Sequence, residues 1–196
     1  MSEKGTKTKE KILREAYNLF ARDGYKNVTM QQICDVTELS RGGLYRHYGS
    51  TEEIFTGILE NLGEGQRENF EIQMREGIPA WIILNKTLAR MEEEMMDPES
   101  SLSFAIYEFS RECSGEFMVK SNQRAREYWK KLIQYGMERK EFRTVGEDEV
   151  IDIIIFSYQG VRMWSQIVKL DPSVAGNIAE HIRKLLQVEG VEENER

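Results

Sequence analysis

Hydrophobic positions along the chain recur with the period of an α-helix. In the first clear run, apolar side chains of residues 12–20 share one face of a helix that Gly24 ends. No segment alternates apolar and polar residues between hairpin turns, so we expect an all-α fold of about nine helices. The predicted helices span residues 8–23, 29–36, 41–48, 51–75, 79–96, 99–113, 115–140, 147–170 and 172–188.

Two hydroxyl side chains mark the starts of short helices near the N-terminus. Thr29 and Ser40 are placed to cap the second and third helices, because a hydroxyl at that position accepts a hydrogen bond from a first-turn amide. In the second helix, Ile33 and Val36 are expected to face inward. Two short helices joined by a tight turn have the layout of a helix-turn-helix. We therefore divide the chain into a DNA-binding domain, residues 1–50, and a larger helical domain, residues 51–196.

The third helix presents chemistry that suits DNA. It combines a guanidinium able to contact guanine through two hydrogen bonds with phenol, guanidinium and imidazole groups that can reach phosphates. Two adjacent glycines would let the helix approach the floor of a groove, or they could mark a loosened turn. Three-helix units also serve as protein-docking modules, so that alternative stays open. The residues concerned are Arg41, Gly42, Gly43, Tyr45, Arg46 and His47.

Charge is divided unequally along the chain. The net charge is −7, but residues 1–50 hold nine basic and six acidic groups, whereas the rest holds 18 basic and 28 acidic groups. Only the N-terminal part would therefore attract a polyanion, although an excess of three positive charges is also compatible with a solvated face.

Dispersed positions between residues 12 and 55 carry a family resemblance. The runs ILREA at 12–16, LFARDGY at 19–25 and LSRGGLYRHYGSTEEIF at 39–55 resemble the N-terminal domain of the tetracycline-repressor (TetR) family. The resemblance implies that Thr29 and His47 contact phosphate and that Gln31 contacts a base or the backbone. The full set of candidate DNA-binding residues is Thr29, Gln31, Ser40, Arg41, Gly42, Gly43, Tyr45, Arg46, His47 and Thr51.

The sequence departs from the family pattern at a few positions. Thr51 stands where many members have a phosphate-binding lysine, and Cys34 where many have alanine. Tyr48 replaces the usual core phenylalanine, so we expect it to pack. One backbone contact at Thr51 is therefore in question, and Cys34 suggests a small buried side chain.

The resemblance implies a one-component transcriptional regulator, by family default a repressor. Such a protein binds a palindromic operator on double-stranded DNA as a homodimer and is released when a small hydrophobic or amphipathic molecule binds the C-terminal domain. An enzyme is poorly supported, because the only histidines are His47 and His181 and no nucleophile–base pair or phosphate loop appears. No cofactor or metal is expected.

The two cysteines define a second regulatory hypothesis. Cys34 and Cys113 lie 79 residues apart and match no metal-ligand spacing, so buried reduced thiols are expected. A thiol close to the reading helix also permits a redox-responsive regulator of the same fold. No stretch approaches 18 consecutive apolar residues, and the N-terminus lacks the apolar core of a signal peptide. No membrane contact and a cytoplasmic location are therefore expected.

The helix predicted over residues 147–170 is apolar around most of its circumference. Such a helix needs cover on two sides, which its own core and the same helix of a second copy could provide. The alternative is that these helices are simply core. The candidate dimer-interface residues are Ile153, Gly160, Trp164, Ile167, Ile178, Ile182 and Leu185.

Large apolar groups with a few polar ones among them are candidates for an effector pocket, although their spacing fits core packing equally well. Glu108 and Arg162 stand out, because a charge inside an apolar bundle needs a partner, which could be a ligand. The full candidate set is Trp81, Phe104, Tyr107, Glu108, Tyr128, Trp129, Phe156, Gln159, Arg162 and Met163.

Three glycines, Gly57, Gly63 and Gly65, weaken the predicted helix 51–75 that joins the two domains. We hypothesise that effector binding shifts this helix and changes the distance between recognition helices. The alternative is a plain bend in a structural helix.

Overall fold

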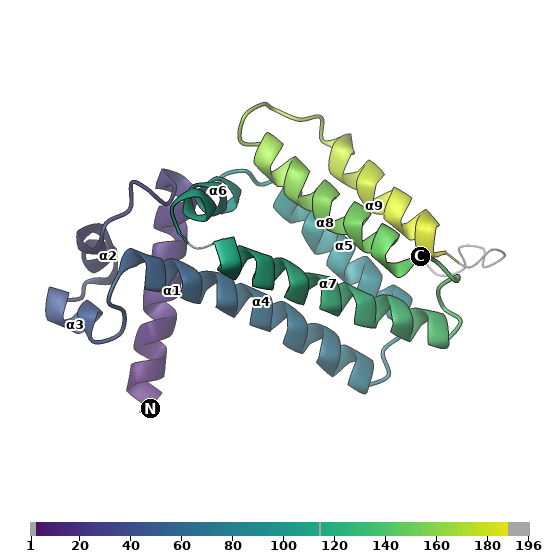
Figure 1. Cartoon of the computed structure of the whole chain (residues 1–196), viewed down its shortest axis with the longest axis horizontal. Helices are drawn as coiled ribbons and strands as arrows, with labels where there is room; N and C mark the ends of the chain where they lie inside the picture. The colour runs from purple at the N-terminus through teal and green to yellow at the C-terminus, as the bar shows by residue number, and fades with distance from the viewer. Residues whose placement is uncertain (1–2, 114, 188–196) are drawn as a thin grey trace. The chain divides into compact units, whose positions relative to one another are not determined.

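The computed structural model describes residues 3–113 and 115–187. Within them the chain is all-α and contains no strand, which confirms the predicted fold class (Figure 1). A single antiparallel bridge joins Phe142 to Gln187. The nine helices are α1 (Glu3–Asp23), α2 (Met30–Thr37), α3 (Arg41–Tyr45), α4 (Thr51–Arg75), α5 (Ala80–Met95), α6 (Ser103–Glu112), α7 (Gly115–Glu138), α8 (Glu147–Trp164) and α9 (Ser173–Leu186).

The predicted helix bounds differ from the structure at both starts and ends. Helix α1 begins at Glu3 rather than residue 8, and α6 begins at Ser103 rather than residue 99. The third helix was expected to reach residue 48, but α3 ends at Tyr45, and the His47 amide donates to the Leu44 carbonyl at 2.9 Å in a tighter turn. In the same way α8 ends at Trp164, six residues early, and the Ile167 amide donates to the Trp164 carbonyl at 2.9 Å. Residue 188, the predicted end of the last helix, lies outside the described residues.

The chain forms two compact units that do not follow the expected boundary at residue 50. The first unit comprises residues 1–64 and 99–121, and the second comprises residues 65–98 and 122–196. The first unit takes in α6 because Ala105 and Phe109, both 1% exposed, are buried in the same core cluster as α1 and α2. Helices α4 and α7 contribute residues to both units.

An aromatic cluster forms the centre of the first unit. In this unit α1 packs on α2 and α6, and α2 packs on α3. Phe20, Tyr25, Phe55 and Phe109 come from four separate segments, with neighbouring ring centroids 4.8–5.9 Å apart. Edge-to-face and tilted pairs at these distances add to the free energy of burying the rings. Val36 on α2, predicted to face inward, is 40% exposed.

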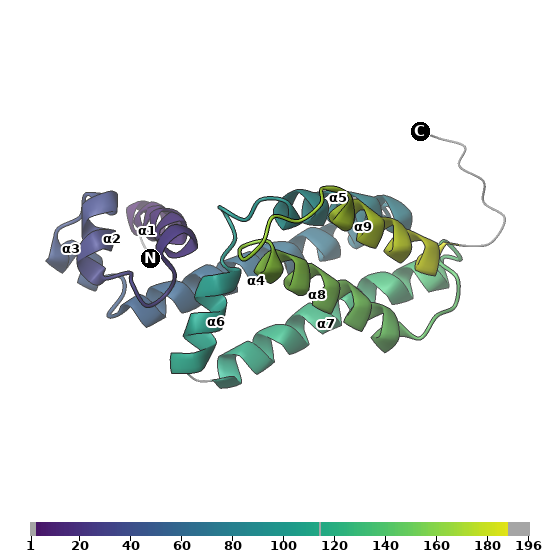
Figure 2. The same cartoon turned by 90° about the horizontal axis from the view of Figure 1, so that it is seen from above.

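Helices α5, α8 and α9 pack on one another in the second unit, and Figure 2 shows α5 beside α9. Leu88, Leu132, Ile151 and Ile182 are at most 1% exposed in its core. None of the helices described here is long and apolar enough to cross a membrane.

The substitution Gly136→Ala should destabilise the second unit. A Cβ at Gly136 would overlap the ring of Phe142, which is 4% exposed and closely packed. Overpacking of this kind costs about 1–3 kcal/mol. Gly63→Ala is the matched control, because a Cβ there meets no atom within 4 Å and alanine favours a helix interior by up to about 1 kcal/mol. Urea unfolding should lower the midpoint only for Gly136→Ala; equal midpoints would contradict the packing described.

Candidate nucleic-acid interface

A reciprocal capping box starts α2. The Thr29 hydroxyl accepts the Gln32 amide at 3.3 Å, and the Gln32 side-chain oxygen accepts the Thr29 amide at 2.8 Å. The Thr29 hydroxyl also donates to the same oxygen at 2.8 Å. The predicted cap is confirmed. If the Thr29 hydroxyl also contacts a phosphate, it must do so while it caps α2.

Three residues, 38–40, connect α2 to α3, as in a helix-turn-helix. Glu38 reverses the chain in the left-handed region with φ 57°, and the Leu39 amide donates to the Cys34 carbonyl at 3.2 Å. Ser40 then accepts the Gly43 amide at 3.1 Å, which confirms its predicted capping role. Both hydrogen bonds fix the direction in which α3 leaves the turn.

One side of α3 is anchored and the other is open. Leu44 is fully buried in the core of the first unit, whereas Arg41 and Arg46 are exposed and Tyr45 is 53% exposed. A Cβ at Gly42 would meet no atom within 4 Å, so this glycine leaves free space on the outer side. The outer side therefore combines cationic donors with room for close approach, which suits a DNA groove.

Arg41 is tied to α2 by a chain of side-chain hydrogen bonds. Its Nε donates to the Gln31 side-chain oxygen at 2.9 Å, and the Gln31 amide donates to Asp35 Oδ1 at 2.8 Å. Gln31 and Arg41, two separate candidates from the sequence, are thus brought together. Gln31 helps to orient the guanidinium, whose remaining donors stay available for a bidentate contact.

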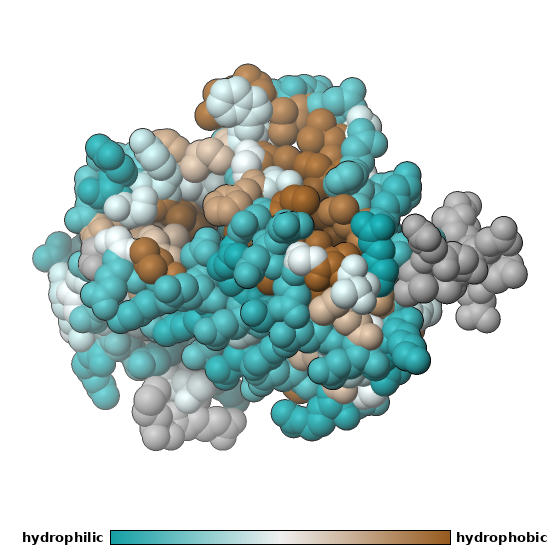
Figure 3. Space-filling view, turned by 45° about the vertical axis from the view of Figure 1, so that its right-hand side comes forward, coloured by the Kyte–Doolittle hydropathy of each residue, from teal (hydrophilic) through white to brown (hydrophobic). Residues whose placement is uncertain are grey.

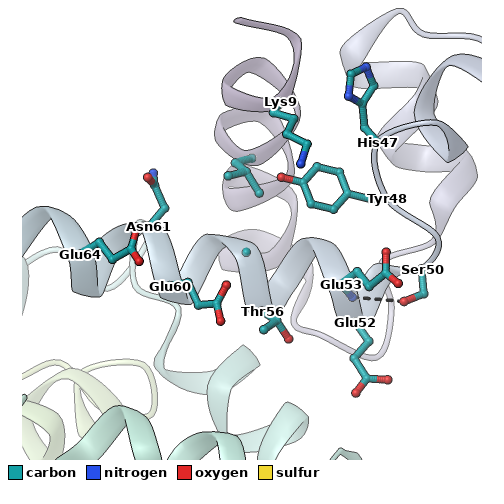
Figure 4. Close-up of a pocket in the computed structure, with 12 residues that line it drawn as sticks. Lys9, His47, Tyr48, Ser50, Glu52, Glu53, Thr56, Glu60, Asn61 and Glu64 are labelled. Atoms are coloured by element: carbon teal, nitrogen blue, oxygen red, sulfur yellow. Dashed lines mark hydrogen bonds between the residues drawn. The ribbon is translucent and has the colours of Figure 1, made fainter. Parts of the chain in front are cut away.

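His47 lines a groove of about 770 Å³ beside α3 (Figure 4). Lys9 and Tyr48 lie on the same side of the groove, with the Lys9 ammonium 5.5 Å from the centre of the Tyr48 ring. Burial, followed by the charge of Glu60, raises the pKa of the Tyr48 phenol. Lys9 is a cation that the sequence argument did not single out, although it lies in the basic run at the start of the chain.

Acidic side chains line the opposite side of this groove along α4, which limits where phosphate can approach. The Ser50 hydroxyl accepts the Glu53 amide at 3.1 Å, and Glu53 in turn accepts the Gly49 amide at 2.6 Å. Thr51 is half-buried at the start of α4. Positive potential is therefore concentrated near Lys9 and on α3, away from the acidic side chains of α4.

Known proteins match this region and the fold. Residues 12–58 match the profile of the bacterial regulatory proteins of the tetR family. The chain is 28% identical over 145 residues to the uncharacterized HTH-type transcriptional regulator YfiR of Bacillus subtilis (strain 168), covering 71% of this chain and 70% of the relative. The profile match places the N-terminal domain of the chain in the TetR family. Over a longer stretch the chain is similar to helix-turn-helix transcriptional regulators.

Two further similarities extend beyond the DNA-binding domain. YerO, an uncharacterized HTH-type transcriptional regulator of the same Bacillus strain, is 23% identical over 196 residues, which cover 91% of this chain but only 64% of YerO. A crystal structure of a TetR transcriptional regulator from Chloroflexus aurantiacus J-10-FL superposes with a TM-score of 0.71 at 22% identity, covering 95% of this chain and 100% of that one. This last likeness extends the TetR-family fold over both units.

The second unit contains a small cavity of about 90 Å³. Three residues predicted for an effector pocket line it: Tyr128, Trp129 and Gln159. The other lining residues have no pattern in the sequence that marks them as pocket residues: Gln66, Phe70, Thr87, Arg90, Met91, Ala125, Ile154, Ile155 and Tyr158.

The remaining predicted pocket residues lie elsewhere. The aromatic ones are exposed because they sit on the outer faces of their helices: Trp81 46%, Phe104 46%, Tyr107 54% and Phe156 62%. Glu108 accepts the Lys26 backbone amide at 3.1 Å, so its partner lies within the first unit. The half-buried Arg162 donates to the Tyr158 hydroxyl at 2.8 Å, and Met163 is half-buried. None of these seven residues lines the cavity.

Both cysteines are free thiols in the first unit. Cys34 is 4% exposed, in keeping with the small buried side chain expected there. The Cys113 sulfur lies 3.4 Å from the Tyr25 hydroxyl, and burial together with this neighbour raises the pKa of the Tyr25 phenol. The redox hypothesis stays a prediction. No group of three or more metal-ligating side chains occurs among the described residues.

Substitutions at Thr29 should separate capping from DNA contact. Thr29→Asp keeps a strong N-cap but places a negative charge against phosphate, whereas Thr29→Ala loses the cap and about 0.5–2 kcal/mol of stability. We expect Thr29→Asp to retain the wild-type unfolding midpoint and to weaken binding to a random-sequence DNA duplex, with Thr29→Ser as the control. Wild-type DNA affinity for Thr29→Asp would show that Thr29 acts only as a cap.

Substitutions at Arg41 and His47 should weaken DNA binding in different ways. Arg41→Ala should relax the preference at one base position by about 1–3 kcal/mol, because a bidentate base contact is lost. His47→Ala should weaken all sequences alike, because a phosphate contact carries no sequence information. Selection of bound sites measures the change in base preference, and titration of one selected site measures the uniform loss, with the exposed Arg111→Ala on α6 as the control. Unchanged binding by both variants would mean that α3 docks in another register.

Proposed function

We propose that this TetR-family regulator represses transcription by binding a palindromic operator as a homodimer. A small molecule in the second unit then releases it from DNA, and no catalytic step is involved. The observation that carries the proposal is the outer side of α3, where the exposed Arg41, Tyr45 and Arg46 surround the free space at Gly42. These groups supply both base-reading and phosphate-binding donors on a helix short enough to enter a major groove.

An apolar stripe on α8 and the turn after it supports the homodimer. Ile153, Phe156, Trp164 and Ile167 are 37–62% exposed and follow one another at helical spacing, with the exposed Gly160 between them. Figure 3 shows hydrophobic side chains gathered over α8 and α9. Exposed apolar surface of this extent favours burial against a second copy, and a two-fold axis would present two α3 helices to two half-sites.

Residues of α9 divide between this face and the core. Ile178 and Leu185, both predicted for the interface, are half-buried. Ile178 packs against the core of the second unit. Ile182 was also predicted for the interface, but it is 1% exposed, because the inner side of α9 packs on α5 and α8. We therefore exclude Ile182 from the proposed interface and keep the other six residues.

Helix α4 is the element that we propose to respond to the effector. It runs without interruption from Thr51 to Arg75, so the boundary between the two units falls within it, between Glu64 and Gly65. Gly63 and Gly65 flank this boundary, and a Cβ at either would meet no atom within 4 Å. Low helix propensity at this point makes a bend inexpensive, so a ligand that favours one bend could alter DNA affinity.

Site selection from random duplex DNA tests the proposal. We expect a palindrome whose half-site centres lie about 34 Å apart or a multiple of that distance. Affinity for this palindrome should fall about 10³-fold or more between 50 and 200 mM salt. Binding releases cations from several phosphates, and this release becomes less favourable as the salt concentration rises. No enrichment of any sequence, together with weak binding at all salt concentrations, would instead support the protein-docking alternative.

The same experiment includes a dimer variant. Ile167→Glu places a charge in the apolar stripe. The molecular mass of the protein in solution should therefore shift toward that of the monomer, and the preference for a palindrome should be lost. Val119→Glu is the matched control, because Val119 on α7 is similarly exposed at 57%. An unchanged dimer with Ile167→Glu would place the interface on another face.

A further inference from the structure

The cavity of the second unit is lined by apolar and neutral polar side chains and by one charged residue. Phe70, Met91, Trp129 and Ile154, all at most 8% exposed, line it together with a few neutral polar side chains. Arg90 is the one charged residue among the cavity-lining residues. A single cationic group in the wall of a largely apolar cavity is the arrangement expected for a molecule with an apolar body and an acidic head.

The charges around Arg90 do not balance. Arg90 Nε lies 3.7 Å from Glu94 Oε1, and the second oxygen of Glu94 accepts the Tyr158 hydroxyl. Arg162 donates to the same hydroxyl at 2.8 Å, with its guanidinium 5.1 Å from the centre of the Tyr158 ring. Glu94 contacts Arg90 directly and Arg162 only through Tyr158, so these two arginines and one glutamate carry a net charge of +1, with the Arg90 side chain 40% exposed.

Both guanidinium groups also have unused hydrogen-bonding capacity. The Nε atoms of Arg90 and Arg162 are buried and make no hydrogen bond to any described residue. A buried donor without an acceptor costs free energy, so an added acceptor would be stabilising.

Two of the three hydroxyl groups that line the cavity are already engaged as donors. The Thr87 hydroxyl donates to the Ile83 carbonyl at 2.8 Å, and the Tyr158 hydroxyl donates to Glu94. Burial raises the pKa of the Tyr158 phenol, so this group stays neutral. The strongest donor that can face a ligand in the cavity is therefore the Arg90 guanidinium.

We propose that the effector is a small monocarboxylic acid, whose carboxylate pairs with Arg90 and whose apolar chain lies against Phe70, Met91, Trp129 and Ile154. This inference rests on the effector response proposed above and specifies its chemistry. An apolar cavity of roughly 150 Å³ holds benzene, so the 90 Å³ present here accommodates a chain of roughly four carbon atoms. Pentanoate is the matching probe.

Calorimetric titration of the full chain without DNA tests the charge and the size of the ligand. Pentanoate should bind about 10- to 100-fold more tightly than pentanamide, which has nearly the same shape without the charge. Pentylamine, with the opposite charge, should not bind, and acetate and octanoate should bind more weakly than pentanoate. Equal affinities for pentanoate and pentanamide would overturn the assignment without reference to any variant.

A variant pair tests the role of Arg90. Arg90→Met keeps the length of the side chain but removes the charge, so it should weaken pentanoate at least 10-fold while leaving the weak pentanamide affinity unchanged. Arg124→Met is the control, because Arg124 is an exposed arginine on α7 that does not line the cavity. Equal pentanoate affinity in the wild type and Arg90→Met would overturn the proposal.

Operator release is measured separately, so that the two proposals can fail independently. Pentanoate binding without loss of operator affinity would support the acid site and contradict its role as an effector site. Operator binding with no affinity for any acid in the series would overturn the acid site and leave the regulator intact.

Discussion

The hydrogen bond from the Gly43 amide to the Ser40 hydroxyl determines where α3 begins. Leu44, one residue further on, is fully buried and anchors the inner side of the helix. The residue at which α3 starts therefore determines which of its side chains face outward. The capping box at Thr29 fixes α2 in the same way, and the left-handed Glu38 leaves the connecting turn little freedom. The direction of every α3 side chain that could meet a base therefore depends on a short-range cap rather than on long-range packing.

The sequence predicted most of the fold because its determinants are local. Hydroxyl caps, glycine stops and apolar periodicity act within a few residues, and they located all nine helices in the described part of the chain. The division into units was not predicted, because it depends on α6 packing into a core whose other members lie about 50 to 90 residues earlier. The exposed Val36 shows the same limit, since a two-turn helix offers too few positions to fix its inner face.

The candidate sites differ in how far sequence could find them. Exposed cations on α3 were recognisable because their function needs only one helix and its outer side. The cavity could not be recognised from the sequence, because a void arises between several helices and has no local pattern. Arg90 and Glu94, spaced i,i+4 on α5, have the pattern of an ordinary surface ion pair, and only the packing of α8 against α5 brings Tyr158 and Arg162 to them.

The chain of hydrogen bonds from Arg41 through Gln31 to Asp35 has a consequence for how such a regulator could acquire a new operator. An arginine that is held in place before DNA arrives loses less rotamer entropy on binding. The direction of this side chain, however, depends on residues of both α2 and α3. Replacing Arg41 alone would leave Gln31 and Asp35 arranged for a partner that is gone. Divergence of base preference in descendants of this protein should thus proceed through linked changes at all three positions.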